Sequence, residues 1–338
     1  LKNQQLVLYN EDTGLVEPTE LGRIASYFYI KPESISIYNR ELTDRSSIID
    51  MFRIFSLSDE FKYISVRQEE RRELQELVAK SPIPSKDDTD SSTIKVNILL
   101  QAYISQLKFE GFALNADMVF IQQNAGRLLR AMYELCLKQR WSQPTKTLLN
   151  LCKSVKWRMW TTNTPLKQFK KCPTEVIKRA ETSTLPWSEY LKFNNPSELG
   201  KAIRVESNGK LVYDLIQRFP IIKLQSTIQP LTPSLLIFDL QITPCWIWDK
   251  SLHGVGEVFL IFVEDTDGKE ILFEDSVLIR EADIDIEQSL SFSIQLSSSQ
   301  QKRLPPTFYI TVMSEKWWHS GSTTVSYTHL TLPTTPYV

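Results

Sequence analysis

The sequence is poor in the residues that usually carry metal or covalent chemistry. It contains four cysteines and three histidines. The cysteines are far apart, with no C-x-x-C pair and no close histidine, which argues against a zinc site or a disulfide framework and favours a reducing compartment. The histidines, His253, His319 and His329, lack metal-ligand spacing. We therefore expect no metal site in this chain.

Nucleotide-binding and hydrolase motifs are also missing. The chain has no G-x-x-x-x-G-K-S/T loop, no G-x-G-x-x-G, no H-E-x-x-H and no G-x-S-x-G. No apolar run reaches the roughly 20 residues needed to cross a bilayer, and the start at Leu1 and Lys2 has no signal-peptide layout. We expect no catalytic residue, no cofactor and no membrane partner. Because the chain does not begin with Met, we also expect it to be a piece of something longer.

Charge is nearly balanced overall but uneven along the chain. There are 39 basic and 40 acidic residues, yet Lys138–Arg179 holds 11 Lys or Arg and a single acid, Glu175. A local positive excess attracts polyanions, because each phosphate that Lys or Arg neutralises releases counterions. Nucleic acid is therefore the first partner to consider.

Four aromatic residues lie in this basic segment: Trp141, Trp157, Trp160 and Phe169. Aromatic faces beside cations suit single-stranded bases, which stack on them for about 1–3 kcal/mol each. The same residues are equally suited to a hydrophobic core, since Trp is highly buried on average. The sequence leaves both interpretations open.

The length of 338 residues exceeds the size at which one core usually keeps growing, so two or three packed units are expected. Leu6–Glu17 predicts a hairpin, and Thr19 is placed as the N-cap of a following helix. Helices are also predicted at Ser46–Leu57 and Val66–Ala79, with a polar loop at Ser81–Thr93.

Two consecutive helices are predicted to carry polar stripes. The first, Lys95–Glu110, places Gln101, Ser105 and Lys108 on one side. The second begins at Asn115 or Asp117 and runs to Cys136. Its predicted core face consists of Ile121, Ala125, Leu128, Met132 and Leu135.

The opposite face of the second helix presents Gln123, Arg127, Arg130 and Glu134. Gly126 in its middle costs about 1 kcal/mol relative to Ala, which indicates a close approach by another backbone or a ligand. The alternative is that Arg127 and Arg130 are simply exposed helix arginines.

Residues Pro173–Phe219 predict a smaller helical unit, with a tight connection at Ser207, Asn208 and Gly209. Two short helices joined by a Gly turn can hold a phosphate on the backbone N–H groups that open the second helix. A plain αα-hairpin fits the same pattern.

From Ile221 onward the apolar period changes to two, which predicts an antiparallel sandwich. Strands are predicted at Leu235–Ile242, Glu257–Val263, Lys269–Ile279, Leu290–Leu296, Phe308–Met313 and Val325–Leu332. Asp267 and Gly268 favour a hairpin turn over a calcium loop. Glu264–Glu287 contains ten acids, which suits protein docking better than RNA binding. The residues after Pro333 resemble a foreign end.

Several motifs resemble the region that follows the winged-helix domain in large superfamily-two RNA helicases. They are Thr19–Ser26, Tyr29–Ile30, Phe52–Ser58, Glu60–Phe61, Val66–Glu70, Leu107–Ala113, Ala125–Arg127 and Leu149–Cys152. The chain is thereby identified as a member of the Sec-sixty-three homology units, and within them it is similar to those of the U5 snRNP helicase family of the spliceosome, more to the first of two helicase cassettes.

The resemblance implies an α+β multidomain fold: an all-α helical bundle, then a helix-loop-helix, then an immunoglobulin-like antiparallel β-sandwich. The implied ranges are 1–17 for the end of an upstream winged-helix domain, 18–172 for the bundle, 173–220 for the helix-loop-helix and 221–338 for the sandwich. It also implies a nuclear protein whose motor domains, with ATP and magnesium, lie outside this chain.

The resemblance further assigns the helix Asn115–Cys136 as a ratchet helix that holds single-stranded snRNA during unwinding of the U4/U6 duplex in pre-mRNA splicing. The implied RNA-binding residues are Gln123, Arg127 and Arg130, with Ser105 and Lys108 as lesser candidates. The leading hypothesis is a non-catalytic accessory module that lines the RNA channel and braces the motor and winged-helix domains. The second is a docking scaffold for spliceosomal proteins through the acidic sandwich.

Overall fold

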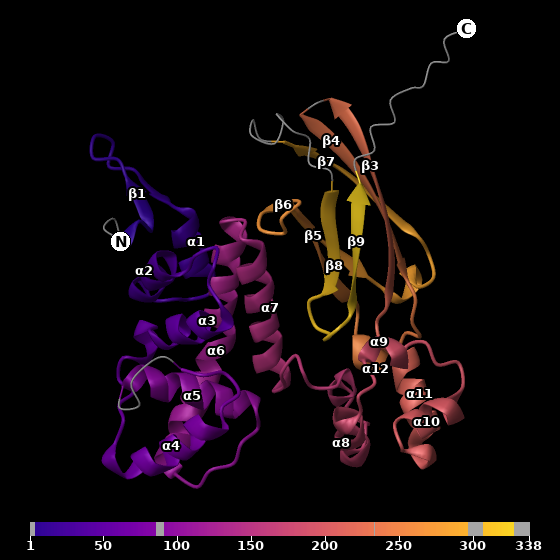
Figure 1. The fold of residues 1–338 in the computed structure, drawn as a ribbon. Coiled ribbons are helices and arrows are strands. Elements are labelled where there is room, and N and C mark those ends of the chain that lie inside the picture. The colour runs from indigo at the N-terminus through magenta and orange to yellow at the C-terminus, as the bar shows by residue number, and fades with distance from the viewer. Residues whose placement is uncertain (1–3, 86–90, 233, 297–306, 328–338) are drawn as a thin grey trace. The chain divides into compact units, whose positions relative to one another are not determined.

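The computed structural model describes residues 4–85, 91–232, 234–296 and 307–327 of the chain. It is an α+β protein that divides into two compact units, Leu1–Thr161 and Thr162–Val338. In Figure 1 the first unit runs from indigo to magenta and the second from magenta to yellow.

The first unit combines a short hairpin with a bundle of helices. Its elements are β1 (Val7–Tyr9), β2 (Val16–Pro18), α1 (Glu20–Tyr27), α2 (Pro32–Glu41), α3 (Ile48–Ser56), η2 (Asp59–Phe61), η3 (Gln68–Glu70), α4 (Arg71–Lys80), α5 (Ser92–Ile104), α6 (Phe112–Lys138) and α7 (Ser142–Trp157). The predicted hairpin is confirmed by antiparallel pairing of β1 with β2. The predicted N-cap is also confirmed, because the Thr19 side chain accepts a hydrogen bond from Gly22 N.

Helix α5 is buried on almost every side and ends earlier than predicted. The expected helix to Glu110 is wrong beyond Ile104, where the chain leaves the helix at Ser105. Gln106 adopts a left-handed φ of 57°, and Leu107 N donates back to Ala102 O at 3.0 Å. This is a Schellman ending, which usually has Gly at the left-handed position, so Gln106 did not mark the end of the helix in the sequence.

A buried ion network ties the start of α6 to α5 and η3. Lys95 on α5 is fully buried, and its Nζ lies 2.5 Å from Glu70 Oε2, 2.7 Å from Asp117 Oδ2 and 2.9 Å from Ser65 O. Burial alone would raise the pKa of Glu70, but hydrogen bonds from Lys95 and Arg67 hold that pKa below its ordinary value.

The second unit begins with helices. They are η4 (Pro165–Gln168), α8 (Thr174–Thr182), α9 (Trp187–Tyr190), α10 (Pro196–Ala202), η5 (Glu206–Asn208) and α11 (Gly209–Gln217). A Cβ on Gly209 would meet Pro196 O at 2.5 Å and Gly200 Cα at 3.1 Å. This glycine therefore serves close packing of α11 on α10, which supports the plain αα-hairpin over a phosphate site.

Two antiparallel sheets complete the second unit. Their strands are β3 (Ile222–Thr232), β4 (Leu235–Pro244), β5 (Glu257–Glu264), β6 (Ile271–Ile279), β7 (Gln288–Gln295), β8 (Thr307–Ser314) and β9 (Gly321–Tyr327), with α12 (Lys250–His253) and η6 (Glu281–Asp283) between strands. The orders are β3-β4-β7 and β6-β5-β8-β9. Residues of both sheets, including Phe238 and Phe308, share one hydrophobic core.

The sequence predicted most of these strands. It missed β3, and the final strand begins at Gly321, four residues before the predicted Val325; residues 328–338 lie outside the described part. The Asp267–Gly268 hairpin turn is confirmed, since Gly268 has a φ of 65° and Asp265 Oδ1 accepts from Lys269 N at 2.7 Å.

Buried polar contacts join the helices of the second unit to its sheets, and Figure 1 shows those helices gathered at one end of the strands. Trp317 lies in the helical core cluster and donates from Nε1 to Glu257 Oε1 at 3.0 Å. His253 is 2% exposed; its Nδ1 accepts from Asp249 N at 3.0 Å, and its Nε2 lies 3.0 Å from Arg218 O. These partners require a neutral ring with the proton on Nε2.

Stability of the second unit should fall in mild acid. Burial lowers the pKa of His253 below its ordinary value, and the hydrogen bonds to Arg218 and Asp249 offset this only in part. Below about pH 6.5 His253 is protonated in the unfolded chain but stays neutral in the folded chain. The free energy of unfolding therefore decreases as the pH falls. Urea unfolding between about pH 7.5 and pH 5.5 should show the free energy of unfolding decreasing with pH, and the dependence on pH should be weaker in His253→Gln. Equal slopes in both proteins would contradict the assignment.

Breaking the ion network should destabilise the first unit strongly. Lys95→Met leaves the buried carboxylate of Glu70 without its ammonium partner, which costs about 3–5 kcal/mol in the free energy of unfolding. Denaturant titration measures this loss. The matched control is Lys108→Met at an exposed position, expected to change stability by less than about 0.5 kcal/mol. Similar values for the two variants would refute the anchoring role of Lys95.

Candidate nucleic-acid interface

Helix α6 has one buried and one open face. All five residues of its predicted core face are buried: Ile121, Ala125, Leu128, Met132 and Leu135. On the opposite face Gln123 and Gly126 are exposed, and Arg127 and Arg130 are half-buried. The predicted amphipathic division of α6 is therefore confirmed, although the helix begins at Phe112, earlier than expected.

Gly126 lies in open space. A Cβ built on it would meet no atom of the chain within 4 Å. A close approach by another backbone, one of the two expectations, is therefore absent in the described part of the chain. Gly in a helix interior costs about 1 kcal/mol relative to Ala, and no packing in the described residues requires it. The remaining expectation is a ligand that passes close to the helix here.

Arg127 holds a neighbouring loop as well as facing the polar side of α6. Its Nη1 donates to the carbonyl oxygen of Tyr29, in the turn after α1, and its Nη2 donates to Asn124 Oδ1 at 2.6 Å. A guanidinium carries five N–H donors, so these contacts leave Arg127 able to contact a phosphate without releasing the loop. The description of Arg127 as a simply exposed helix arginine is wrong.

Arg130 lies one turn further along and is also partly engaged. Its Nε lies 3.6 Å from Glu134 Oε1, and its Cζ lies 4.7 Å from the centre of the Tyr133 ring. An i,i+4 pair of this kind is worth only a few tenths of a kcal/mol, so an anionic ligand could compete for the guanidinium.

The lesser candidates do not form the predicted stripe. Gln101 is buried and bonds Ile83 O and Asn97 Oδ1, each at 2.9 Å. Ser105 closes α5 and accepts from Trp160 Nε1 at 2.9 Å, while Lys108 is exposed in the segment beyond the helix. The predicted polar stripe is wrong because the helix that was expected to carry it ends at Ile104.

The aromatic residues of the basic segment are mostly structural. Phe169 is 1% exposed in the second unit, beside Trp317. In the first unit Trp160 bonds Ser105 and packs 6.0 Å from the Phe52 ring. Trp141 and Trp157 are half-buried. The core interpretation therefore holds for Phe169, and the half-buried Trp160 is engaged with Ser105 and Phe52.

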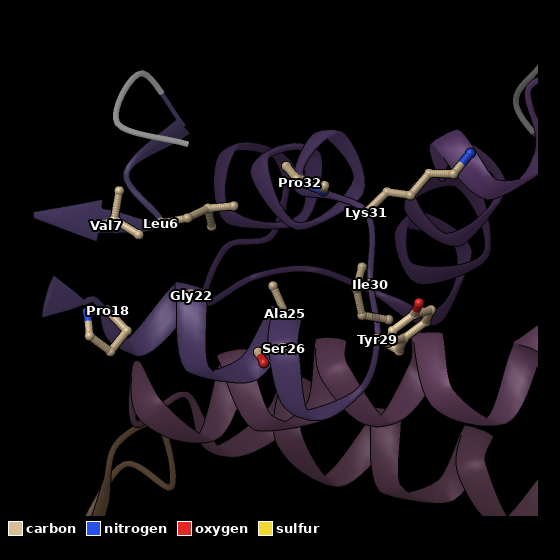
Figure 2. A pocket seen from close by; sticks show the side chains of 10 residues that line it. All are labelled: Leu6, Val7, Pro18, Gly22, Ala25, Ser26, Tyr29, Ile30, Lys31 and Pro32. Carbon is tan, nitrogen blue, oxygen red and sulfur yellow. The ribbon is translucent and has the colours of Figure 1, made fainter. Parts of the chain in front are cut away.

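The described residues also bear on metal binding and on membrane insertion. No group of three or more His, Cys, Asp or Glu side chains there could hold a metal ion. Within the same ranges, no helix is long and apolar enough to span a bilayer. A cavity of about 480 Å³ lies between the hairpin and helices α1 and α2. Figure 2 shows Leu6, Ala25 and Ile30 directed into this cavity, so its lining is mainly apolar.

Comparison with known proteins places the chain in a family. Residues 18–326 match the family model described as the Sec63 Brl domain. The chain is 43% identical over 336 residues to the U5 small nuclear ribonucleoprotein 200 kDa helicase of Drosophila melanogaster, and 42% identical over 334 residues to the human protein of that name. Each alignment covers 98% of this chain and 15% of the relative.

A third relative, the pre-mRNA-splicing factor brr2 of Schizosaccharomyces pombe, is 40% identical over 320 residues, which cover 95% of this chain and 14% of the relative. The chain thus spans about one seventh of the length of these curated relatives. The family resemblance stated from the sequence is confirmed, because the matched region covers nearly the whole chain and the identities are high. The chain belongs to the Sec63 Brl domain family, in the form found in spliceosomal RNA helicases.

Proposed function

We propose that this chain is a non-catalytic accessory module of a spliceosomal RNA helicase, and that the open face of α6 lines the path of a single RNA strand. The observation that carries the proposal is the exposed polar surface around Gly126, where a glycine in mid-helix has no packing reason in the described chain. The relatives named as helicases and splicing factors support the setting.

The chemistry of this face suits a moving strand. Arg127 and Arg130 offer charge to phosphates, and the Gln123 amide offers both a donor and an acceptor to a base or a ribose. Gly126 between them lets a sugar–phosphate backbone approach the helix more closely than any side chain would permit. Phosphate contacts of this kind hold RNA without fixing its sequence, as translocation requires.

The remaining assignments follow from the family. We propose a helical bundle over 18–172, a helix-loop-helix over 173–220 and an immunoglobulin-like sandwich over 221–338, with 1–17 ending a winged-helix domain. The parent protein would unwind the U4/U6 snRNA duplex during pre-mRNA splicing in the nucleus, with this chain as part of its first cassette. ATP and magnesium would act at motor domains outside the chain, which the bundle braces.

A second candidate function is protein docking through the sheets of the second unit. Among the described residues β6 hydrogen-bonds to β5 alone, so it is an edge strand, and Glu274 and Asp275 on it are exposed. Acidic side chains repel RNA and attract basic proteins. Binding of a spliceosomal protein that is lost on reversing these two charges, with RNA binding unchanged, would support this role beside the first.

Filling the space at Gly126 should weaken RNA binding without harming the fold. Gly126→Leu adds a side chain to an exposed helix position, so the unfolding midpoint should stay equal or rise, since Leu is the better helix former. Affinity for single-stranded RNA, measured by fluorescence anisotropy on the complete polypeptide, should fall about tenfold. The matched control, Ala79→Leu at an exposed position of α4, should leave affinity unchanged. Equal affinities for the two variants would sink the proposal.

Removing the two positive charges from the open face of α6 should slow RNA unwinding by the complete helicase. Arg127→Ala with Arg130→Ala in the complete helicase should lower the unwinding rate about tenfold or more, because the strand loses two cationic contacts. The salt dependence of RNA affinity should become shallower by about two in its logarithmic slope. Normal unwinding by the double variant would count against the channel role.

A further inference from the structure

Exposed aromatic residues surround the part of α6 that faces the strand. Tyr29 is 88% exposed in the turn after α1, Tyr63 is 85% exposed after η2, and Phe120 on α6 is 44% exposed. Large apolar groups at such exposure gain little from the fold, and together they indicate a surface that meets a partner. None of the three was a candidate from the sequence.

Side-chain contacts link these residues to one surface of the first unit. Arg127 binds the Tyr29 carbonyl, and the Phe61 ring lies 6.2 Å from that of Phe120, with edge-to-face geometry. Phe120 and Arg127 are seven residues apart on α6, two turns along the same face. Tyr63 follows Phe61 by two residues, and Asp59 pairs with both Lys31 and Lys62, so the segment after η2 is tied to the α1–α2 turn.

Two lysines close in sequence to these tyrosines share one carboxylate. Lys31 Nζ lies 2.9 Å from Asp59 Oδ2, and Lys62 Nζ lies 3.2 Å from the same oxygen. Lys62 Nζ also lies 5.3 Å from the centre of the Tyr63 ring. Asp59 thus ties Lys31, two residues after Tyr29, to Lys62 beside the Tyr63 ring, and each lysine remains substantially exposed. Figure 2 shows the Lys31 side chain extending away from Leu6 and Val7 of the hairpin.

The backbone conformation at Tyr29 is one that disfavours a tyrosine. Tyr29 has a φ of 56° and occupies the left-handed position of a Schellman ending, with Ile30 N bonded to Ala25 O at 2.8 Å. Gly or Asn is more stable than Tyr in that conformation. A tyrosine that is disfavoured there, is 88% exposed and makes no aromatic stacking contact with the described residues breaks a local rule, which is typical of a functional position.

We propose that Tyr29 and Tyr63 are stacking platforms for the bases of the single RNA strand whose backbone passes α6 near Gly126, with Lys31 and Lys62 beside the phosphates. The inference rests on the proposed function and adds a base-contacting surface to it. Stacking tolerates every base because each has a π face, so the surface grips RNA without reading sequence. A single strand is favoured over a duplex because stacking needs unpaired bases.

The test separates stacking from phosphate contact in the complete polypeptide. Anisotropy is measured with oligoadenylate and with an abasic ribose–phosphate strand of equal length. Tyr29→Asn and Tyr63→Ala should each lower affinity for oligoadenylate by about fivefold or more and leave affinity for the abasic strand unchanged. The unfolding midpoint of Tyr29→Asn should stay equal or rise, since Asn suits the left-handed turn. Phe112→Ser, an equally exposed aromatic about 22 Å along α6 from Arg127, is the control and should bind both probes normally.

Each result decides between the two proposals. Unchanged oligoadenylate affinity in both tyrosine variants, with loss in Gly126→Leu, overturns the stacking surface and leaves the α6 face standing. Unchanged affinity in Gly126→Leu as well overturns the α6 face and with it this inference. Equal loss on both probes in the tyrosine variants also overturns stacking, because bases would then not be what the rings contact.

Discussion

The structure of the first unit depends on the burial of one stripe of α6. Each fully buried Leu, Ile or Met on that stripe contributes about 1.5–3 kcal/mol, which fixes the rotation of the helix about its axis. Once the apolar stripe is committed to the bundle, the opposite side must face outward, and Gln123, Gly126 and the two arginines are held there. The position of a surface for RNA is therefore a consequence of core packing.

Local contacts then refine this surface. The buried Lys95 network fixes the first turns of α6, and Arg127 fixes the α1–α2 turn against its middle. The Arg127 guanidinium lies on the open side of α6 and also binds the α1–α2 turn. That turn carries Tyr29, so the same side chain positions both parts of the proposed surface. Variants of Arg127 therefore change loop position together with charge, whereas substitution of Gly126 fills the space above the helix and leaves the charge of the face unchanged.

Much of this could be predicted from sequence, because it follows from local rules. The 3.6-residue period placed the open face of α6, and Thr19 marked a helix start. Failures occurred where local rules were broken. Gln106 ends α5 in a left-handed conformation that Gly usually adopts, so the predicted stripe through Lys108 was drawn on a helix that had already ended. Strand β3 was missed because polar residues such as Gln225 and Gln229 occupy much of it.

Other features could not be read from sequence at all because they join distant residues. Arg127 and Tyr29 are 98 positions apart, and the surface that contains Tyr63 and Phe120 exists only after the bundle has formed. The sequence left two interpretations of the aromatic residues in the basic segment open for a related reason, since Trp160 and Phe169 find partners in two different units.

The most direct test of the account is a structure of the complete polypeptide bound to a single RNA strand, with the shortest distance from RNA to the Gly126 Cα measured. The account predicts that sugar or phosphate atoms lie within about 5 Å of that Cα, near van der Waals contact. A protein domain packed over Gly126, with the strand running elsewhere, would contradict it.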